Sequence, residues 1–267
     1  KNKRTKNIGV VIPDIVHHFF TTVIRGIEKY ANARGYNVIV CLSEESFDKE
    51  VINMEMLANG SIDGFIMSLS SETQEKSDYN HLKEVTEQGI PVVLFDELGA
   101  YQATNKFIDQ GKRKIALITT DDYLSVSKAR TKGYRKALEE SNLGIDESMI
   151  LKMPSMEMDE LAIKTFLNEK EPDAVLCVNE IFAVYSMRLV QEKGLKIPED
   201  IAFIGFTDGV LSKYANPSLT VVAQHGEKMG EVSAKMLIDK VESEAEEETY
   251  QTKILEPTLV IRDSIAH

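Results

Sequence analysis

Short apolar runs alternate along this chain with longer stretches in which apolar residues recur at helical spacing. The runs are IGVVIP (8–13), YNVIVCLS (36–43), DGFIMSLS (63–70), PVVLFD (91–96), KIALITT (114–120), DAVLCVNE (173–180) and IAFIGFTD (201–208). Nearly continuous hydrophobicity is typical of strands in a parallel sheet that helices cover on both faces, whereas a sheet with one wet face shows alternation. The pattern therefore predicts an α/β fold with parallel sheets flanked by helices.

The stretches between these runs have the three- and four-residue spacing of amphipathic helices. In the first of them, Phe20, Val23, Ile27 and Ala31 fall on one helix face. Gly35 ends that helix, because glycine readily adopts a positive φ. The same spacing predicts helices near 47–59, 78–88, 99–110, 126–142, 158–169, 181–193 and 227–243.

The alternating pattern begins twice, at TKNIGVVIP and again at GKRKIALITT. This restart favours two similar lobes over one very wide sheet. After LTVVAQHG the chain adds one more helix and then a strand-like LEPTLVIRD. An acidic run from Glu242 to Glu248 separates the two, and we expect a solvated helix end and turn there, with a partner site as the alternative.

Length and charge narrow the class of protein. A chain of 267 residues that is 43% hydrophobic can bury one large core or two ordinary ones. It has no apolar run of about 18 residues and no visible export signal, so we expect a soluble cytoplasmic protein. A formal net charge of −12 repels phosphate backbones, so we do not expect this stretch alone to bind DNA strongly. Cys41 and Cys177 lie inside strand-like runs, which favours small buried side chains over a disulfide or a nucleophile.

Motifs of enzymes and metal sites are missing from the sequence. The turns after the first strands read PDIVHH, SEESFD and SLSSET, without the glycines that close a backbone around phosphate. GxSxG and HExxH are absent. His17 and His18 are neighbours whose side chains point apart on a turn, so they make a poor metal pair. We therefore expect no enzyme, no cofactor and no metal.

Polar and aromatic residues gather where the predicted strands end. They are Asp14 with Phe19 and Phe20, Ser43, Ser68 with Ser70, Asp96 with Glu97, Thr120 with Asp121, Asn179 with Glu180, and Thr207 with Asp208. Ligands bind at this edge of open parallel sheets, and two lobes facing edge to edge would form a cleft for a small polar molecule. Each residue taken alone could equally be a helix cap, since Ser, Thr, Asp and Asn are favoured there.

The sequence resembles the lactose-repressor-like (LacI/GalR) transcription regulators along nearly its whole length. The matching segments, in order, include the opening IGVVIPDIVHHFF, DGFIMSLS, GIPVVLFD, GKRKIALIT, RTKGYRKAL, PDAVLCVNEIFAVYSM, GLKIPEDIAFIGFTD, NPSLTVVAQHGEKMG and EPTLVIRDS. The Pro-Ser-Leu-Thr stretch with its following Met-Gly, and the Leu-Val-Ile-Arg-Asp ending, distinguish these regulators from periplasmic sugar-binding proteins of the same general fold.

The resemblance implies a core of two Rossmann-like, periplasmic-binding-protein-like subdomains joined by crossover strands near residues 112, 224 and 250. The first subdomain would comprise 1–112 plus 225–249, and the second 113–224 plus 250–267. It also implies a homodimer built along the lobes. In the family a helix-turn-helix domain precedes this core, so we expect operator DNA to be read only by a domain before residue 1.

The resemblance also assigns candidate effector-binding residues. Phe19 and Phe20 match aromatic positions that line the family's cleft, with a place in the core as the alternative for either one. Arg130 matches an arginine that grips effector hydroxyls or a carboxylate through its planar fork. The full set of candidate effector-binding residues is Asp14, Phe19, Phe20, Ser43, Ser68, Asp96, Thr120, Asp121, Arg130, Asn179, Glu180, Thr207 and Asp208.

Several positions depart from the family pattern. Asn179 matches the family's asparagine, but Glu180 stands where an aspartate follows it. Thr207 occupies the place of an aspartate that accepts ligand hydroxyl protons, and Asp208 comes after it. Glu97 stands where an arginine often follows Phe-Asp. The family has a further stretch between residues 97 and 98 that holds the sixth strand of the first lobe. Either this protein lacks that strand or residues are missing from the sequence at this point; we favour the second interpretation, in which Glu97 need not be a pocket residue. These departures leave the effector's identity open.

We expect the effector to be a sugar, sugar phosphate or related polyol. An uncharged one is favoured, because Arg130 is the one cation that the motifs place among several acids. Its binding would shift one lobe against the other and so change the operator affinity of the dimer. Two other classes of protein stay open on sequence alone: an exported sugar-binding receptor and a sugar-processing enzyme.

Overall fold

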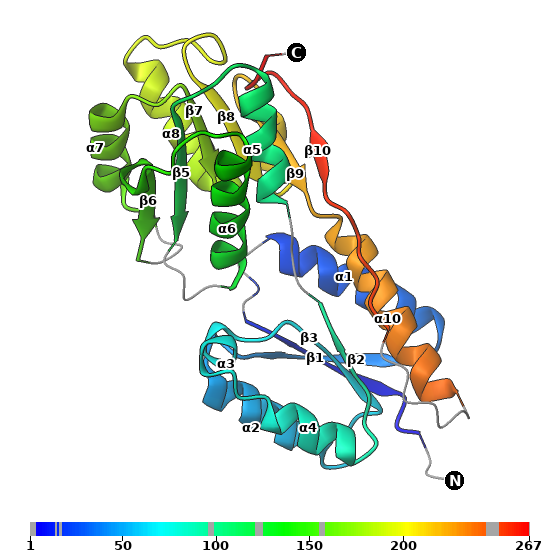
Figure 1. Ribbon diagram of the computed structural model, residues 1–267. Helices are drawn as coiled ribbons and strands as arrows, with labels where there is room; N and C mark the ends of the chain where they lie inside the picture. Colours follow the sequence, from blue (N-terminus) through cyan, green and yellow to red (C-terminus); the bar gives the residue numbers. More distant parts are fainter. Residues whose placement is uncertain are drawn as a thin grey trace. The chain divides into compact units, whose positions relative to one another are not determined.

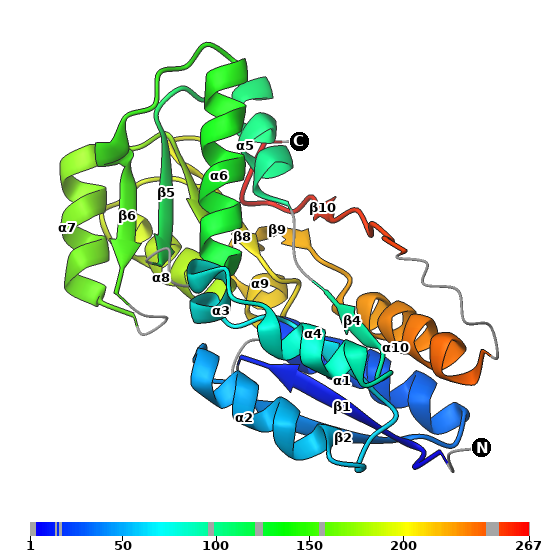
Figure 2. The ribbon, with the colours of Figure 1, turned by 60° about the horizontal axis from the view of Figure 1, so that its bottom comes forward.

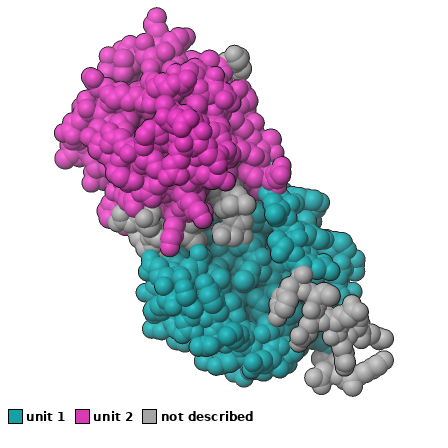
Figure 3. All heavy atoms as spheres, in the orientation of Figure 1, with its two compact units in different colours: residues 1–96, 225–255 teal, residues 97–224, 256–267 magenta. Residues whose placement is uncertain are grey.

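The computed structural model describes residues 4–13, 15, 18–95, 99–120, 125–154, 158–243 and 251–266. The chain divides into two compact units, each assembled from two separate stretches of sequence (Figure 3). Unit 1 comprises Lys1–Asp96 and His225–Leu255, and unit 2 comprises Glu97–Gln224 and Glu256–His267. Both units contain a sheet flanked by helices, so the α/β fold predicted from the apolar runs is confirmed (Figure 1).

In unit 1 the described strands form a parallel sheet in the order β2-β1-β3-β4. These strands are β1 (Asn7–Ile12), β2 (Asn37–Leu42), β3 (Gly64–Met67) and β4 (Val92–Leu94). The helices of unit 1 are α1 (His18–Ala33), α2 (Phe47–Ala58), α3 (Ser71–Lys76), α4 (Asn80–Glu87) and α10 (Gly226–Glu242). Figures 1 and 2 show α1 and α10 together on one face of the sheet and α2 with α4 on the other.

Both faces of this sheet are buried. Ile8, Val10 and Ile12 project from alternate positions of β1, as the two-residue period of a strand requires, and pack with α1 and α10. Val11 and Phe65 point the other way and share a cluster with residues of α2 and α4. This two-sided burial explains why the strand sequences are almost continuously apolar.

Glycines bring the backbones of α1 and α10 into direct contact. A Cβ atom at Gly26 would lie 1.9 Å from the carbonyl oxygen of Glu227, and one at Gly230 would lie 2.0 Å from the carbonyl oxygen of Val23. No side chain fits in either place. The two helices can therefore pack this closely only because both positions are glycine.

Unit 2 contains a sheet whose described strands have the order β10-β9-β8-β7-β5-β6, parallel except that β10 is antiparallel to β9. These strands are β5 (Ile115–Thr120), β6 (Ile150–Met153), β7 (Ala174–Cys177), β8 (Ala202–Phe206), β9 (Thr220–Ala223) and β10 (Thr258–Val260). The helices are α5 (Ala100–Asp109), α6 (Ser125–Glu140), the 3₁₀ turn η1 (Glu147–Met149), α7 (Glu160–Lys170), α8 (Glu180–Glu192) and α9 (Val210–Tyr214).

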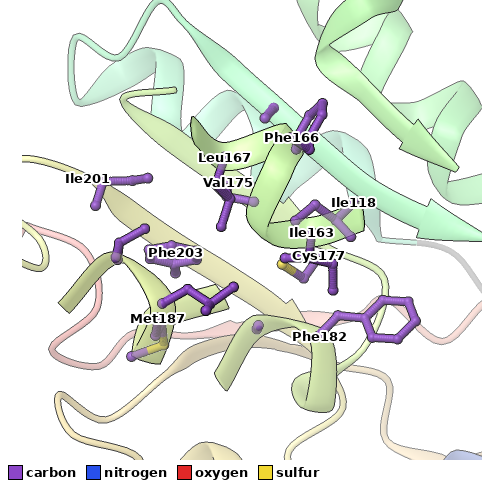
Figure 4. Packing of buried hydrophobic residues seen from close by; sticks show 14 of the residues in the cluster. Ile118, Ile163, Phe166, Leu167, Val175, Cys177, Phe182, Met187, Ile201 and Phe203 are labelled. Atoms are coloured by element: carbon purple, nitrogen blue, oxygen red, sulfur yellow. The ribbon is translucent and has the colours of Figure 1, made fainter. Parts of the chain in front are cut away.

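Two clusters of buried residues cover the two faces of the unit 2 sheet. On one face, Ile163 of α7 and Phe182 of α8 pack on Val175, Cys177 and Phe203 (Figure 4). On the opposite face, α5 and α6 pack on the remaining inward positions of the same strands. The C-terminal segment is fastened to this unit by Ser264, whose hydroxyl donates to the Phe203 carbonyl oxygen at 2.6 Å and accepts from the Thr220 amide at 2.8 Å.

The structure corrects the unit to which one helix belongs. The family resemblance implies that helix 99–110 belongs to the first lobe, with the first crossover near residue 112. Instead, α5 belongs to unit 2, where Ala103 and Phe107 are buried in one cluster with Tyr134 of α6. A Cβ atom at Gly133 would lie 2.9 Å from the Tyr101 amide nitrogen, so α5 and α6 also pack closely. The crossover therefore precedes α5.

Five short elements are not predicted from the sequence: α3, the 3₁₀ turn η1, β6, α9 and β9. Lys152 interrupts the apolar run of β6, and the two helices are too short to show a helical period. Residues 96–98, where the family has its further strand, and most of the acidic run Glu242–Glu248 lie outside the described residues. Among the residues that are described, no helix has the length and apolarity needed to cross a membrane.

Replacing Gly26 with alanine should destabilise unit 1. Alanine favours an isolated helix over glycine by about 1 kcal/mol, but here its methyl group meets the backbone of α10, which cannot move aside. We expect the free energy of unfolding to fall by about 1–3 kcal/mol or more, as in overpacked cores. Urea denaturation followed by circular dichroism measures this.

Gly144→Ala is the matched control, because a Cβ atom there would meet nothing within 4 Å. That variant should unfold at the wild-type urea concentration. If Gly26→Ala were as stable as the wild type, α1 and α10 would not be held in backbone contact.

Candidate functional site

The carboxyl ends of β5, β7, β8 and β9 lie along one edge of the unit 2 sheet, because these neighbouring strands are parallel. Arg130 reaches this edge from α6 and is buried, with 7% of its surface exposed. Its guanidinium donates a hydrogen bond to the carbonyl oxygen of Val178, just after β7. Its Cζ atom also lies 3.8 Å from the ring centroid of Phe206, at the end of β8. The hydrogen bond and the cation–π contact hold a buried positive charge in a fixed orientation.

Thr207 and Gln224 follow β8 and β9 at the same edge. The Thr207 hydroxyl donates to the Gln224 side-chain oxygen at 3.3 Å, and Thr207 has a φ of 77°, which is uncommon for a β-branched residue. Gln224 is 5% exposed, and its Nε2 atom has no hydrogen-bond partner among the described residues. If the Gln224 amide is flipped, its oxygen rather than its nitrogen lacks a hydrogen-bond partner among the described residues. In either orientation a buried polar atom is left unpaired, which costs free energy.

Gln224 was not predicted as a site residue. The signal in the sequence was weak: a polar residue after the short apolar run TVVA, which was not recognised as a strand. Its unsatisfied amide becomes visible only when the folded unit brings Thr207 beside it.

Asn179 and Glu180 have clear roles in the local fold. The Asn179 side-chain oxygen accepts from the Phe182 amide at 2.8 Å and caps α8. The Glu180 carboxylate accepts from the Ser212 amide at 2.9 Å, in the first turn of α9. That carboxylate lies against Gly209, where a Cβ atom would be only 2.0 Å from its Oε1 atom. Glu180 therefore caps α9 from another helix, which the sequence could not show.

Asp208 forms ion pairs within unit 2. Its carboxylate accepts a hydrogen bond from the guanidinium of Arg262 and lies 3.9 Å from the Lys213 amine. Arg262 also donates to the Leu219 carbonyl oxygen at 2.8 Å, so the pair joins the C-terminal segment to the sheet. Thr120, at the end of β5, is hydrogen-bonded through its hydroxyl to that of Ser127 and is fully buried.

In unit 1, Phe19 and Phe20 pack with Phe95, with ring centroids 5.4 to 6.4 Å apart. Each of the two is 6% exposed and belongs to the core cluster beneath α1 and α10. Burial of this kind matches the alternative role in the core, and their contact with a ligand stays a prediction.

Two serines follow strands of unit 1. Ser43 comes after β2 and is fully buried, and its hydroxyl lacks a partner in the described part of the chain. Ser68 comes after β3 and is buried. The remaining candidates Asp14, Asp96 and Asp121, together with Glu97 and His17, lie outside the described residues.

The cysteines show no sign of nucleophilic or metal chemistry. Burial raises the pKa of the Cys177 thiol strongly and that of the half-buried Cys41 thiol as well, so both favour the protonated form. Within the described residues, His, Cys, Asp and Glu nowhere gather in a group of three that could hold a metal ion.

Comparison with known proteins identifies several similar chains. A family described as "Periplasmic binding protein-like domain" matches residues 104–265. The transcriptional repressor PurR of Vibrio atlanticus is 30% identical over 99% of this chain and 83% of that protein. The ribose operon repressor of Haemophilus influenzae is 28% identical over 99% of this chain and 82% of that protein. The crystal structure of the regulator CcpA of Lactococcus lactis covers 98% of this chain and 100% of its own, with a TM-score of 0.81 and 26% identity.

Replacing Glu180 with alanine should loosen α9. The Ser212 amide would lose its acceptor, and loss of a cap costs about 1 kcal/mol. We expect hydrogen exchange at that amide to quicken accordingly, as NMR can measure for a single residue. Glu192→Ala, at the exposed far end of α8, should leave Ser212 unchanged. Unaltered protection of Ser212 in Glu180→Ala would contradict the capping role.

Proposed function

Because this chain belongs to the LacI/GalR family of transcriptional regulators, we propose that its effector binds at the carboxyl edge of the unit 2 sheet. The chain is the ligand-sensing part of such a regulator, as relatives along 99% of its length are transcriptional repressors. These relatives favour a regulator over an exported receptor or an enzyme. They also support a cytoplasmic location.

The observation that carries the proposed site is the pairing of a fixed cation with an unsatisfied amide at one sheet edge. Arg130 is oriented by Val178 and Phe206, and the Gln224 amide lacks a partner among the described residues. A ligand oxygen placed there would accept from the amide and restore a hydrogen bond that the ligand-free fold leaves unmade. Buried polar groups of this kind fix the orientation and specificity of small ligands.

Sugars, sugar phosphates and polyols are the ligands we favour, with neutral ones first. Their hydroxyl groups both donate and accept, and therefore suit an edge that offers an amide and the hydroxyl of Thr207. The acids at this edge, Asp208 and Glu180, already have partners in the fold. One relative is named as a ribose operon repressor, which supports a sugar-type effector.

Effector binding would act on DNA by favouring one conformation of the core. A ligand shifts an equilibrium only by its difference in affinity for the two states. A coupling free energy of about 1–3 kcal/mol corresponds to a 5- to 150-fold change in operator affinity.

The proposed functional form is a homodimer, and each unit has an exposed apolar face that a second copy could cover. In unit 1, β2 lies at the edge of the described sheet, and Ile52 and Met56 of α2, which packs on β2, are 60% and 56% exposed. In unit 2, Val210 and Tyr214 of α9 are 67% and 84% exposed. Exposed edge strands and apolar patches are otherwise liabilities for a soluble chain.

The effector site can be tested with Arg130 and Gln224. A thermal-shift screen of neutral sugars, polyols and sugar phosphates should find a compound that raises the melting temperature, because it binds only the folded state. Calorimetry should then show that Arg130→Ala weakens its binding by about ten- to a hundredfold, since a hydrogen bond to a charged group contributes about 1.5–3 kcal/mol.

Gln224→Met separates binding from folding, because methionine matches glutamine in length but has no amide to leave unpaired. The ligand-free variant should be at least as stable as the wild type while its effector affinity falls. Arg135→Ala, on an exposed part of α6 where Arg135 pairs with Glu147, is the control and should bind normally. Wild-type affinity in both Arg130→Ala and Gln224→Met would rule out this site.

The dimer face on unit 1 can be tested separately. The double substitution Ile52→Asp and Met56→Asp places two charges on the exposed side of α2, where burial against a second copy would desolvate them. Sedimentation velocity should show a monomer. Leu161→Asp, at an equally exposed position on α7, should leave the dimer intact. A dimer that survives the double substitution would exclude this face.

A further inference from the structure

Glycine follows asparagine or aspartate at three places in the chain. The pairs are Asn59–Gly60, Asp63–Gly64 and Asp208–Gly209. In such a pair the backbone nitrogen of the glycine can attack the side-chain carbonyl carbon of the residue before it and close a five-membered succinimide ring. The reaction is intramolecular, and glycine has no Cβ atom to obstruct it. The sequence alone does not distinguish the three pairs.

The fold restrains the Asp63–Gly64 pair. The Asp63 carboxylate accepts hydrogen bonds from the Thr5 amide at 2.7 Å and from the Lys6 amide at 2.9 Å. Gly64 is buried at the start of β3, where a Cβ atom would lie only 2.6 Å from Cδ1 of Leu237. The carboxylate and the glycine nitrogen can react only if these contacts break.

The Asp208–Gly209 pair is restrained in a similar way. The Asp208 carboxylate accepts a hydrogen bond from the Arg262 guanidinium. Gly209 is buried, and a Cβ atom there would lie 2.0 Å from Oε1 of Glu180. Ring closure at either aspartate therefore requires local unfolding of the surrounding chain.

The Asn59–Gly60 pair lies at the exposed end of α2 and is restrained much less. A Cβ atom at Gly60 would meet nothing within 4 Å, and the Asn59 side chain has no hydrogen-bond partner among the described residues. Asn59 has a φ of −69° and a ψ of 46°, close to an inverse γ-turn. In this turn the Gly60 amide donates to the Ala58 carbonyl oxygen at 2.7 Å. A single hydrogen bond thus restrains the attacking nitrogen.

We propose that Asn59 is a site of spontaneous deamidation in the folded protein. The Gly60 nitrogen bonds to Cγ of Asn59, and Nδ2 leaves as ammonia, which carries away the proton of the Gly60 amide. Water then opens the ring. Attack at Cγ gives aspartate, and attack at the backbone carbonyl gives isoaspartate. Water is the only co-reactant, and the site does not rest on the effector or the dimer proposed above.

Deamidation loosens the last turn of α2. The new carboxylate lies four residues after Glu55 and at the C-terminal end of a helix, and both neighbourhoods are unfavourable for a negative charge. Isoaspartate also adds a methylene group to the main chain just before Ser61, whose amide donates to the Leu57 carbonyl oxygen at 3.3 Å.

The reaction can be followed by peptide mapping with mass spectrometry on the purified chain, kept in a mildly alkaline buffer either folded or unfolded in urea. Electron-transfer fragmentation separates isoaspartate from aspartate. We expect residue 59 to convert in the folded chain within about tenfold of its rate in urea, because one hydrogen bond must open. Asn59→Gln is the matched variant and should show no conversion over the same time, since its ring would need six members.

The two aspartates provide an internal control in the same chain. In a mildly acidic buffer, where aspartate closes the same ring with loss of water, isoaspartate at Asp63 and Asp208 should form in urea at least about tenfold faster than in the folded chain, because several contacts must break. No conversion of residue 59 in the folded chain, or equally fast reaction at Asp63 or Asp208 when folded, would overturn the proposal.

The effect on α2 can be measured with Asn59→Asp, which adds the charge without lengthening the main chain. Hydrogen exchange at the Ser61 amide should quicken about twofold, as expected for one like-charge pair on a helix. Adding Glu55→Gln should return it toward the wild-type rate. Unchanged exchange at Ser61 in Asn59→Asp would contradict the predicted loosening.

Discussion

The contact between the backbones of α1 and α10 is the constraint on which unit 1 depends. The face of its sheet formed by Ile8, Val10 and Ile66 is apolar, and α1 alone cannot cover it. The missing cover, including Leu237, comes from a helix that the chain supplies only after it has built most of unit 2. Gly26 and Gly230 let that helix come close enough to seal the face. Because a parallel sheet must be covered on both sides, unit 1 is complete only when α10 has returned. Folding of the two units is thereby linked through the chain itself.

The helices and most strands could be predicted because their signals are local. The apolar runs correspond to β1, β2, β3, β4, β5, β7 and β8, and the longer helices begin and end close to the predicted residues. Helix α5 was assigned to the wrong lobe because its buried face, with Ala103 and Phe107, is equally apolar whichever sheet it covers. The close packing of α5 on α6 at Gly133 shows that the helix belongs to unit 2, and the spacing of apolar residues along the sequence cannot reveal such a contact. Strand β6 was missed for a different reason, since Lys152 makes its four residues look like a loop.

The strand-end residues show why a site is harder to predict than a fold. Asn179 and Glu180 are candidates because they follow a strand. In the structure, however, the side-chain oxygen of Asn179 accepts from the Phe182 amide, and the carboxylate of Glu180 accepts from the Ser212 amide. Asp208 likewise has cations as neighbours, one of which, Arg262, lies far along the chain. Helix-capping residues and ligand-binding residues thus occupy the same kind of position at a strand end. Hydrogen-bond or ion-pair partners that are distant in sequence decide which of the two roles a side chain can take. Arg130 differs because its contacts with Val178 and Phe206 orient the guanidinium at the sheet edge that Thr207 and Gln224 also follow.

The proposed effector site rests on one physical criterion, a buried polar atom that has no hydrogen-bond partner among the described residues. Several hydroxyls, such as those of Ser43 and Thr119, also lack partners there, but a hydroxyl can rotate toward a weak contact at small cost. The amide of Gln224 cannot do so, because its other end already accepts from the Thr207 hydroxyl. The free energy that such an atom loses in the empty protein is recovered only when a ligand of complementary chemistry arrives. At Gln224 the neighbouring group is the hydroxyl of Thr207, and the guanidinium of Arg130 belongs to the same sheet edge; both suit an oxygen-rich ligand. The chemistry of the surroundings, rather than the unpaired atom itself, therefore determines which class of molecule unit 2 would recognise.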